Sequence, residues 1–377
     1  MSSSAWFGPP VSPDPDAGGV VAIPPPAAPA PAPAADPVVI VAPDSFKGTL
    51  TAGEVAGALG RGLREGGIPR PVLMPIADGG EGTLEVLAAG LGAALRTARV
   101  HDPLGREIEA AYALSADGRT AVVEVARAVG LGLVGVGERD AWAASSAGVG
   151  ELILAAVEDG AREIVVGLGG SATTDGGAGA IAAVSGAGGL GRAHLVVLCD
   201  VTTPFELAAE VFAPQKGADP ETVRRLTERL ERQAGELPRD PRGVAMTGSA
   251  GGLAGGLWAR FGAHLVPGAA YVLDRVGFDE RLVGAAAVIT GEGRLDAQTA
   301  AGKAAHVVVS RAVAAGVPAH AVVGQNAMSP ADWRRMGLAS VREAGTPAAL
   351  GRAGRALAGV VLAESRPVSR ERRPPPR

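Results

Sequence analysis

One glycine-rich stretch, GLGGSATTDGGAGA from Gly167 to Ala180, constrains the fold of this chain more than any other. Residues 163–166 before it form a short run that is apolar and β-branched after Glu163, which predicts a buried strand. The apolar residues after it can continue as a helix. Strand, glycine turn and helix in this order are typical of open parallel sheets, in which ligands bind beyond the carboxyl ends of the strands.

The polar residues of this turn indicate a phosphate site. Glycines let backbone N–H groups approach a ligand closely, and the start of a helix favours an anion. Ser171, Thr173 and Thr174 add hydroxyl donors, and Asp175 adds a carboxylate that could hold a metal or accept a proton. The simpler alternative is a tight turn whose polar residues cap the helix. Because four such residues exceed what a cap needs, we favour a functional turn.

Composition narrows the class of protein. A chain of 377 residues predicts two domains, and 47% hydrophobic but only 3% aromatic residues suit α/β layers. The net charge of −4 gives no reason to expect nucleic acid, and no apolar run is long enough to predict a membrane span. Cys199 is the single cysteine, so no intrachain disulfide can form and a reducing, cytoplasmic compartment fits.

The two ends of the chain differ from the rest. Residues 1–36 are rich in proline and alanine, and residues 365–377 are rich in arginine and proline, so both predict disordered tails outside the fold. The first segment lacks the basic start and apolar core of a secretory signal.

The middle of the chain alternates strands, turns and helices. Residues 38–42 and 72–77 predict strands, and Thr51 with Glu54 resembles a capping box that starts a helix. Alternation around residues 102–105 predicts an antiparallel hairpin. We therefore expect an α/β fold with a Rossmann-like parallel-sheet domain, into which a second α/β domain containing antiparallel hairpins is inserted. The expected boundaries are 37–80, 145–200 and 285–364 for the first domain, and 81–144 and 201–284 for the second.

Carboxylates follow several of the predicted strands. They are Asp44, Asp78, Asp175, Asp200 and the pair Glu292 and Asp296. If these strands share one sheet, the acids meet at one rim, where one or two could hold Mg²⁺ and another could accept a proton. Nearby cations, which could neutralise phosphate or a substrate carboxylate, are Lys47, Lys216, Arg294 and Lys303. Any one acid alone is better explained as a turn or cap residue, but together they predict phosphoryl-transfer chemistry.

Other motifs are weaker. Residues 167–172 fit the dinucleotide pattern G-x-G-x-x-G/A, but 56 of the 377 residues are glycine, so chance matches are common. No acid follows about 20 residues later at a strand end, where a ribose ligand belongs. An NAD-dependent oxidoreductase is the alternative that this glycine pattern would indicate, and the missing acid weighs against it. Gly302 and Lys303 do not form a phosphate-binding P-loop, because positions 297 and 304 are alanine.

Eight sequence blocks occur in order along residues 38–324: APDSFKGTLTAGEVA, PIADGGEGT, SSAGVGELI, GLGGSATTDGGAGA, LCDVTTPF, VFAPQKGA, GSAGGLAGGL and VITGEGRLDAQTAAGKA. Together they resemble the bacterial glycerate kinase family of the glycerate 2-kinase type. The resemblance implies ATP-dependent phosphorylation of D-glycerate with Mg²⁺, in two α/β domains of which one is Rossmann-like. It favours 2-phosphoglycerate as the product, although the residues themselves do not choose between the two hydroxyls. The small-molecule partner is then D-glycerate, and a homodimer is left open.

The resemblance also supplies matching positions for site residues, whose roles are our hypotheses. The catalytic set is Asp200, Asp175 and Lys47, with Asp200 the first choice for activating the glycerate hydroxyl. The substrate-binding set is Asp44, Ser45, Asp78, Glu81, Lys216 and Arg294. The nucleotide-binding set is Gly169, Gly170, Ser171, Thr173, Gly251 and Gly252, and the metal-binding pair is Asp296 and Glu292.

The chain departs from the family pattern in two connections. Only residues 185–193 join the helix after Ala180 to the strand that begins at His194, and the connection after Pro204 is also short. A truncated, non-catalytic protein that binds a sugar acid or a nucleotide is therefore a third interpretation.

Overall fold

The computed structural model describes residues 36–297, 299 and 303–365. The predicted tails lie outside the described residues except for Asp36 and Ser365.

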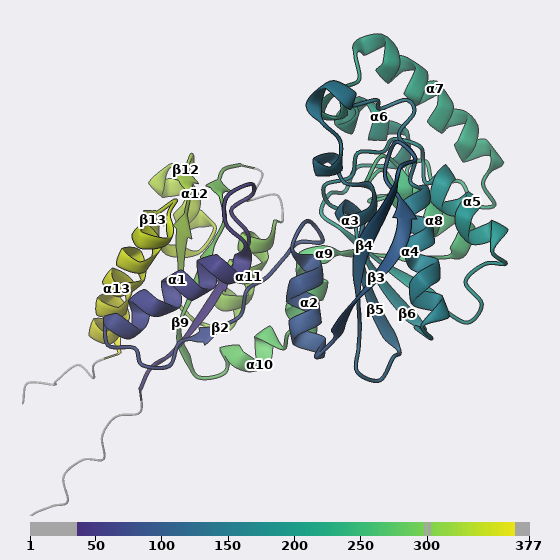
Figure 1. The fold of residues 1–377 in the computed structure, drawn as a ribbon. Coiled ribbons are helices and arrows are strands. Elements are labelled where there is room, and N and C mark those ends of the chain that lie inside the picture. Colours follow the sequence, from purple (N-terminus) through teal and green to yellow (C-terminus); the bar gives the residue numbers. More distant parts are fainter. Residues whose placement is uncertain (1–35, 298, 300–302, 366–377) are drawn as a thin grey trace, which may run out of the picture. The chain divides into compact units, whose positions relative to one another are not determined.

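The first sheet has five parallel strands in the order β13-β11-β9-β1-β2 (Figure 1). Their bounds are β1 Val38–Pro43, β2 Val72–Leu73, β9 Ala285–Gly291, β11 Ala319–Val323 and β13 Leu338–Glu343. Successive residues of β1 enter different cores, because side chains alternate across a strand. Val39 and Val41 pack with α1 and α13, and Ile40 and Ala42 lie in the cluster that contains α11. The sheet is thus covered on both faces, as a parallel sheet requires.

Three of the five helices of this part begin at a side-chain cap. The helices are α1 Ala52–Glu65, α10 Phe278–Leu282, α11 Ala304–Ala314, α12 Pro330–Arg335 and α13 Pro347–Glu364. At α1 the predicted capping box is present, with Thr51 Oγ1 accepting from the Glu54 backbone N–H at 3.2 Å. The predicted strand 72–77 is regular only over two residues. Pro75 has no N–H to donate, although Met74 and Ile76 still donate to β1 carbonyls.

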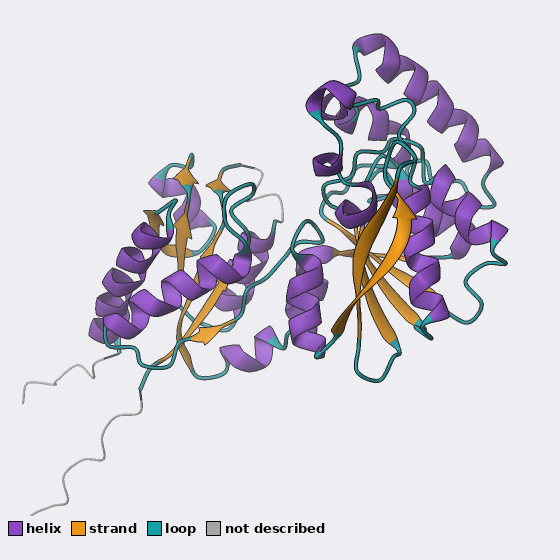
Figure 2. Cartoon of the chain, viewed as in Figure 1, coloured by secondary structure: helices purple, strands orange, loops and turns teal. Residues whose placement is uncertain are grey.

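The second sheet has six strands in the order β3-β4-β5-β6-β7-β8 (Figure 2). Their bounds are β3 Ala94–His101, β4 Glu107–Leu114, β5 Thr120–Glu124, β6 Glu163–Gly167, β7 His194–Cys199 and β8 His264–Pro267. The predicted hairpin joins β3 to β4, β4 pairs antiparallel with β5, and β5 to β8 are parallel. The chain leaves the first sheet after β2 and returns at β9, which confirms the inserted second domain of the predicted fold class.

One predicted grouping is wrong at the level of strand pairing. Residues 145–200 are predicted to share a domain with residues 37–80 and 285–364, but β6 and β7 lie inside the six-stranded sheet. Their apolar, β-branched sequences predict buried parallel strands correctly, yet both sheets contain such strands. Strand type alone therefore does not tell which sheet a strand joins.

Helices cover both faces of the second sheet. They are α2 Thr83–Leu91, α3 Val125–Val129, α4 Ala147–Glu158, α5 Ala178–Gly186, α8 Leu253–Phe261 and α9 Gly268–Arg275. α3, α4, α5 and α8 share one core with the sheet, and α2 lies in the other. Helix α9 contributes Leu273 to a core of the first sheet and Val272 to a core of the second.

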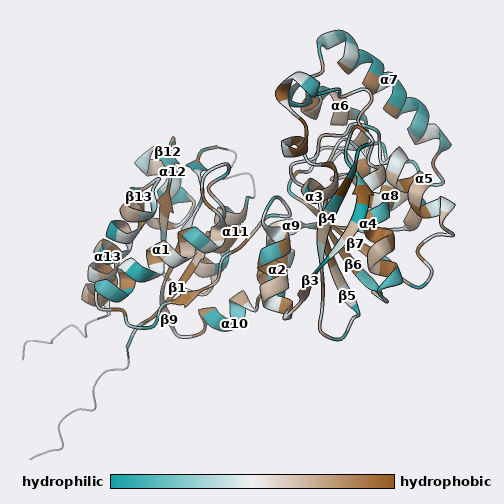
Figure 3. Cartoon of the chain, viewed as in Figure 1, coloured by the Kyte–Doolittle hydropathy of each residue, from teal (hydrophilic) through white to brown (hydrophobic). Residues whose placement is uncertain are grey.

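A small helical segment follows β7 and has its own apolar cluster. It comprises α6 Ala208–Phe212, α7 Pro220–Glu236 and two short 3₁₀ turns at Phe205–Leu207 and Pro214–Lys216. Leu226, Leu230 and Ala234, spaced by four residues, place one face of α7 against Phe205 and α6. Polar and charged residues occupy much of the rest of α7 (Figure 3).

The remaining elements are short. They are the strands β10 Arg294–Leu295 and β12 Gln325–Asn326, which pair in parallel, and 3₁₀ turns at Leu131–Leu133 and Val136–Glu138. Among the described residues, no helix is both long enough and apolar enough to cross a bilayer.

Candidate active site

Charged residues that lie far apart in the sequence act on one another at the end of β1. Lys47 interacts electrostatically with Asp78, Asp44, Asp200 and Glu81. Asp44 and Lys47 follow a strand of the first sheet, whereas Asp200 follows β7 of the second. The structure therefore brings together a large part of the predicted acids, although their strands belong to two sheets rather than one.

The turn after β1 presents Asp44 and Lys47 differently. The Asp44 N–H donates to the Gly291 carbonyl at 2.8 Å, and its carboxylate accepts the Ser45 N–H at 2.6 Å. Buried Phe46 then anchors the turn through backbone bonds with Leu50. The Asp44 side chain is consequently buried, while Lys47 is exposed.

Glycines allow the segment that follows Asp78 to pack closely against the end of the second sheet. Gly79 has φ of 97°, and a Cβ there would lie 2.9 Å from the Leu198 carbonyl oxygen. The Gly169 N–H donates to the Gly79 carbonyl at 3.0 Å, and a Cβ on Gly169 would lie 2.3 Å from the Gly80 Cα. Backbone therefore packs on backbone where this segment passes β6 and β7, which only glycine permits.

Burial and repulsion between neighbouring carboxylates raise the pKa values of several acids in this cluster. Burial, with the Asp78 carboxylate second, raises the pKa of Asp44 to about 8. Burial raises the pKa of Glu292 to about 7, and burial followed by Asp78 raises that of Asp200. The same acids, Asp78 foremost, raise the pKa of Lys47. A cluster of this kind favours the binding of a proton or a cation, and the Lys47 ammonium is the positive charge with which several of its acids interact.

The turn after β9 supplies the other acids of the cluster. Thr299 Oγ1 donates to Glu292 Oε1 at 2.7 Å. Asp296 lies 3.3 Å from Arg294 Nε through its Oδ2, and Arg294 also donates to Gln325. Glu292 acts on Asp44, and Lys303 acts on both Glu292 and Asp200. The predicted metal-binding pair is thus linked to the Asp44 cluster through Glu292.

Asp175, predicted as a second catalytic acid, is occupied in capping helices. Its Oδ2 accepts the Ser146 N–H at 2.9 Å, the Ser146 hydroxyl at 2.8 Å and the Gly179 N–H at 3.1 Å, and its Oδ1 accepts the Gly177 N–H. These contacts tie the starts of α4 and α5 together. Asp175 acts electrostatically on Lys216 and Arg229, and it is not among the acids that act most strongly on Lys47. The capping alternative describes this residue better than a catalytic role.

Ser171 and Thr173 of the glycine turn are bonded to each other, whereas the buried Thr174 hydroxyl has no hydrogen-bond partner among the described residues. Ser171 Oγ and Thr173 Oγ1 lie 3.0 Å apart, and both side chains are buried. Lys216, predicted to bind substrate, is only 3% exposed, and its Nζ donates to the Thr173 carbonyl at 2.5 Å. Burial lowers the pKa of Lys216 to about 7.

The second glycine loop packs against the first. A Cβ on Gly251 would lie 2.1 Å from the Thr173 carbonyl oxygen, and one on Gly252 would lie 2.8 Å from the Phe205 ring. Close packing therefore accounts for these two glycines. Gly170, with φ of 73°, is exposed, and its missing Cβ leaves room for the Glu81 carboxylate.

Sequence reasoning missed several residues that shape this region. Buried Glu124 accepts the N–H groups of Gly82 and Leu84 and so fixes the start of α2. A carboxylate at the end of an apolar strand run was the available signal. Arg229 and Gln233 donate from α7 to carbonyls of the glycine turn. The sequence of α7 is rich in charged residues, so it did not indicate which of its polar side chains face inward.

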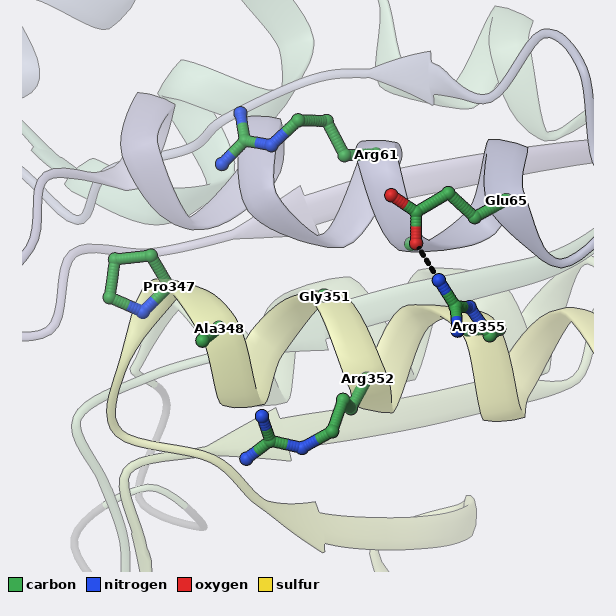
Figure 4. Close-up of a pocket in the computed structure, with 8 residues that line it drawn as sticks. Arg61, Glu65, Pro347, Ala348, Gly351, Arg352 and Arg355 are labelled. Carbon is green, nitrogen blue, oxygen red and sulfur yellow. Dashed lines mark hydrogen bonds and ion pairs between the residues drawn. The ribbon is translucent and has the colours of Figure 1, made fainter.

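A cavity of about 350 Å³ lies between α1 and α13, away from these residues (Figure 4). Arg61, Arg352 and the ion pair of Glu65 with Arg355 line it. Glycines let the two helices approach closely here, since a Cβ on Gly62 would lie 1.9 Å from the backbone of α13. No predicted site residue lines this cavity, so we do not assign the substrate to it.

Comparison with known proteins supplies the context for this geometry. The sequence profile of the glycerate kinase family matches residues 39–190 and 186–353, and the two stretches meet in the connection before β7. A glycerate kinase of Halalkalibacterium halodurans is 39% identical over 323 residues, which cover 76% of this chain and 85% of that protein. The glycerate 2-kinase of Escherichia coli is 38% identical over 302 residues, covering 70% and 79%.

A solved structure agrees with these matches. The crystal structure of a provisionally assigned glycerate kinase 2 from Salmonella typhimurium LT2 superposes with a TM-score of 0.75 at 34% identity. The superposition covers 86% of this chain and 98% of the other.

Proposed function

The chain belongs to the glycerate kinase family, and we propose on that premise that it phosphorylates D-glycerate with ATP, giving 2-phosphoglycerate. The observation that carries the proposal is the cluster in which Lys47 is shared by acids that follow strands of both sheets. Phosphoryl transfer depends on positioning and on charge stabilisation, and such a cluster supplies fixed charges of both signs.

In this proposal Asp200 is the general base. Asp200 is an exposed residue as a whole, but desolvation of its carboxylate, followed by repulsion from Asp78, raises its pKa and so strengthens it as a base. Asp200 takes the proton of the attacking glycerate hydroxyl. The new bond joins that oxygen to the γ-phosphorus, while the bond from the γ-phosphorus to the β-phosphate oxygen breaks and releases ADP.

The remaining residues bind and orient. Lys47 and Arg294 hold the glycerate carboxylate or the transferring phosphoryl group, and Asp44, Ser45, Asp78 and Glu81 shape the substrate site around them. Gly169 and Gly170, which are partly and fully exposed, approach the nucleotide phosphates. Their buried neighbours in the two glycine loops support that backbone from behind.

The acids after β9 suit Mg²⁺ in chemistry. Mg²⁺ is usually bound by one or two carboxylates together with water and substrate phosphates. The described residues contain no group of three or more His, Cys, Asp or Glu arranged as a metal cage. Glu292 fits the smaller set, because its buried carboxylate has a pKa near 7 and a dication would offset the cost of its charge. We propose Glu292 and Asp296 as ligands, and Mg²⁺ bound there would neutralise phosphate charge.

A coupled assay of ADP release with D-glycerate, ATP and Mg²⁺ tests the proposal. We expect release that needs all three components, and the product spectrum in ³¹P NMR to be that of 2-phosphoglycerate. Nicotinamide binding seen by fluorescence titration, with no ADP release, would favour the oxidoreductase instead. Ligand binding without turnover would favour the non-catalytic alternative.

Two further assignments are part of the proposal. We place the protein in the cytoplasm, because its single cysteine, Cys199, is buried and unpaired. A homodimer stays an open option that analytical ultracentrifugation would decide.

A further inference from the structure

Three consecutive carbonyls of the glycine turn each accept a side-chain hydrogen bond from one segment. Lys216 Nζ donates to the Thr173 carbonyl at 2.5 Å, and Arg229 Nη2 donates to the Thr174 carbonyl at 2.7 Å. Gln233 Nε2 donates to the Asp175 carbonyl at 3.1 Å. All three donors lie between residues 216 and 233, in the small helical segment that follows β7.

The donors are held in place by their own surroundings. Arg229 is half-buried and also donates to the Trp142 carbonyl at 2.9 Å, with its guanidinium 4.6 Å from the Trp142 ring centroid. Lys216 is buried. Leu230, between Arg229 and Gln233, is buried in the apolar cluster of the segment together with Phe205. The donors are therefore fixed before any ligand arrives.

Phe205 joins this segment to both glycine loops. Cβ atoms on Gly176, Gly252 and Gly255 would lie 3.0, 2.8 and 2.5 Å from its ring. The side of the turn that bears the Asp175 carboxylate is fixed separately, by the starts of α4 and α5. The carbonyls of Thr173 and Thr174 are thus the part of the turn that the helical segment holds, while the Asp175 carbonyl also accepts the Ala178 N–H at 3.0 Å.

A hydrogen bond that fixes the orientation of a carbonyl also fixes that of the N–H group in the same peptide. The carbonyl of one residue and the N–H of the next lie in one planar peptide and point in opposite directions. Bonds to the carbonyls of Thr173, Thr174 and Asp175 therefore fix the directions of the N–H groups of residues 174–176, and the Gly176 N–H in turn donates to the Gly251 carbonyl at 3.1 Å. The same turn continues backward through Ser171 to Gly170, where the backbone is exposed beside Glu81.

We infer that residues 205–236 form a carbonyl clamp that positions the glycine turn for phosphoryl transfer, with Lys216, Arg229 and Gln233 as its positioning residues. This inference rests on the proposed kinase function. It gives Lys216 a role that acts through the turn and not on the substrate.

The test compares Arg229→Met and Gln233→Met with a matched control, Arg224→Met. Methionine keeps much of the side-chain length but cannot donate. Arg224 lies on the same helix and, within the described part of the chain, forms ion pairs with exposed Glu221 and Glu228 alone. We expect kcat to fall roughly ten- to hundredfold in the clamp variants, as for other misplaced groups remote from the chemistry. KM for D-glycerate should change little, the control should stay near wild type, and Arg229→Lys should recover part of the rate.

A second readout does not need activity. Hydrogen–deuterium exchange of residues 171–177 should speed up in the clamp variants and not in Arg224→Met. A wild-type enzyme without ADP release overturns the kinase function, and exchange then still tests the clamp. The clamp is overturned if exchange in the turn is unchanged, or if kcat per folded molecule, with folded fraction from circular dichroism, equals that of the control.

Discussion

At the scale of single residues, the site depends on how fully local hydrogen bonds occupy each carboxylate. Asp44 and Asp78 each accept one backbone N–H and act on Lys47. Asp175 instead accepts three backbone N–H groups and a serine hydroxyl. The residue types and their places after strands were predictable from the sequence. The direction of each side chain was not, because a carboxylate in a glycine turn serves as a helix cap or as a base with the same local sequence.

Asp200→Asn tests the proposed base. Asparagine keeps the size of the side chain but cannot accept the hydroxyl proton, so we expect kcat to fall roughly 10²- to 10⁴-fold with an unchanged circular dichroism spectrum. Asp279→Asn, at an exposed ion pair with Arg311, is the control and should keep full activity. An Asp200→Asn enzyme near wild-type kcat would remove Asp200 from the mechanism.

The raised pKa of Asp44 predicts a dependence of stability on pH. The folded protein holds the Asp44 proton up to about pH 8, whereas the unfolded chain releases it near pH 3.8. Between these values the unfolded state binds fewer protons, so the stabilising contribution of neutral Asp44 is lost as pH rises.

Urea unfolding at pH 5 and pH 8 measures this loss. Wild type should lose more free energy of unfolding between these pH values than Asp44→Asn, by about 1 kcal/mol or more. Equal losses in the two proteins would show that Asp44 is ionised in the folded state at pH 5.

At the scale of elements, the sequence predicted strands and helices well where hydrophobic period and caps agreed. α1 with its capping box and the hairpin of β3 and β4 are confirmed. The second strand is regular over two residues only, although Met74 and Ile76 still donate to β1 carbonyls on either side of Pro75. β8, only His264–Pro267, was not predicted, since four residues carry too little periodic signal and its partner β7 is distant in sequence.

Close packing of α1 on α13 gives a prediction at this scale. In Gly62→Ala the new Cβ would meet the Gly351 carbonyl at 1.9 Å, so the helices must separate, and we expect a loss of about 1–3 kcal/mol. Gly57→Ala in the same helix meets nothing nearer than Arg61 Nη1 at 3.7 Å and should stabilise by about 0.5–1 kcal/mol. Urea denaturation of both variants checks the opposite signs, and two changes of one sign would contradict this packing.

At the scale of the whole chain, the sequence predicted an inserted α/β domain but assigned residues 145–200 to the wrong sheet. A strand end that carries an acid looks alike in either sheet, so convergence onto one site could be predicted while the supporting sheet could not. The site is thus built from turns after β1, β2 and β9 on one side of the topology and after β7 on the other.

A double-mutant cycle in kcat/KM for Lys47→Met and Asp200→Asn tests the central claim most directly, because the two residues follow strands of different sheets. If both act on one phosphoryl transfer, each single change should lower kcat/KM strongly, and the double variant should be only slightly slower than the slower single variant. Losses that multiply in the double variant would show that Lys47 and Asp200 act independently, and would contradict a single catalytic centre shared by the two sheets.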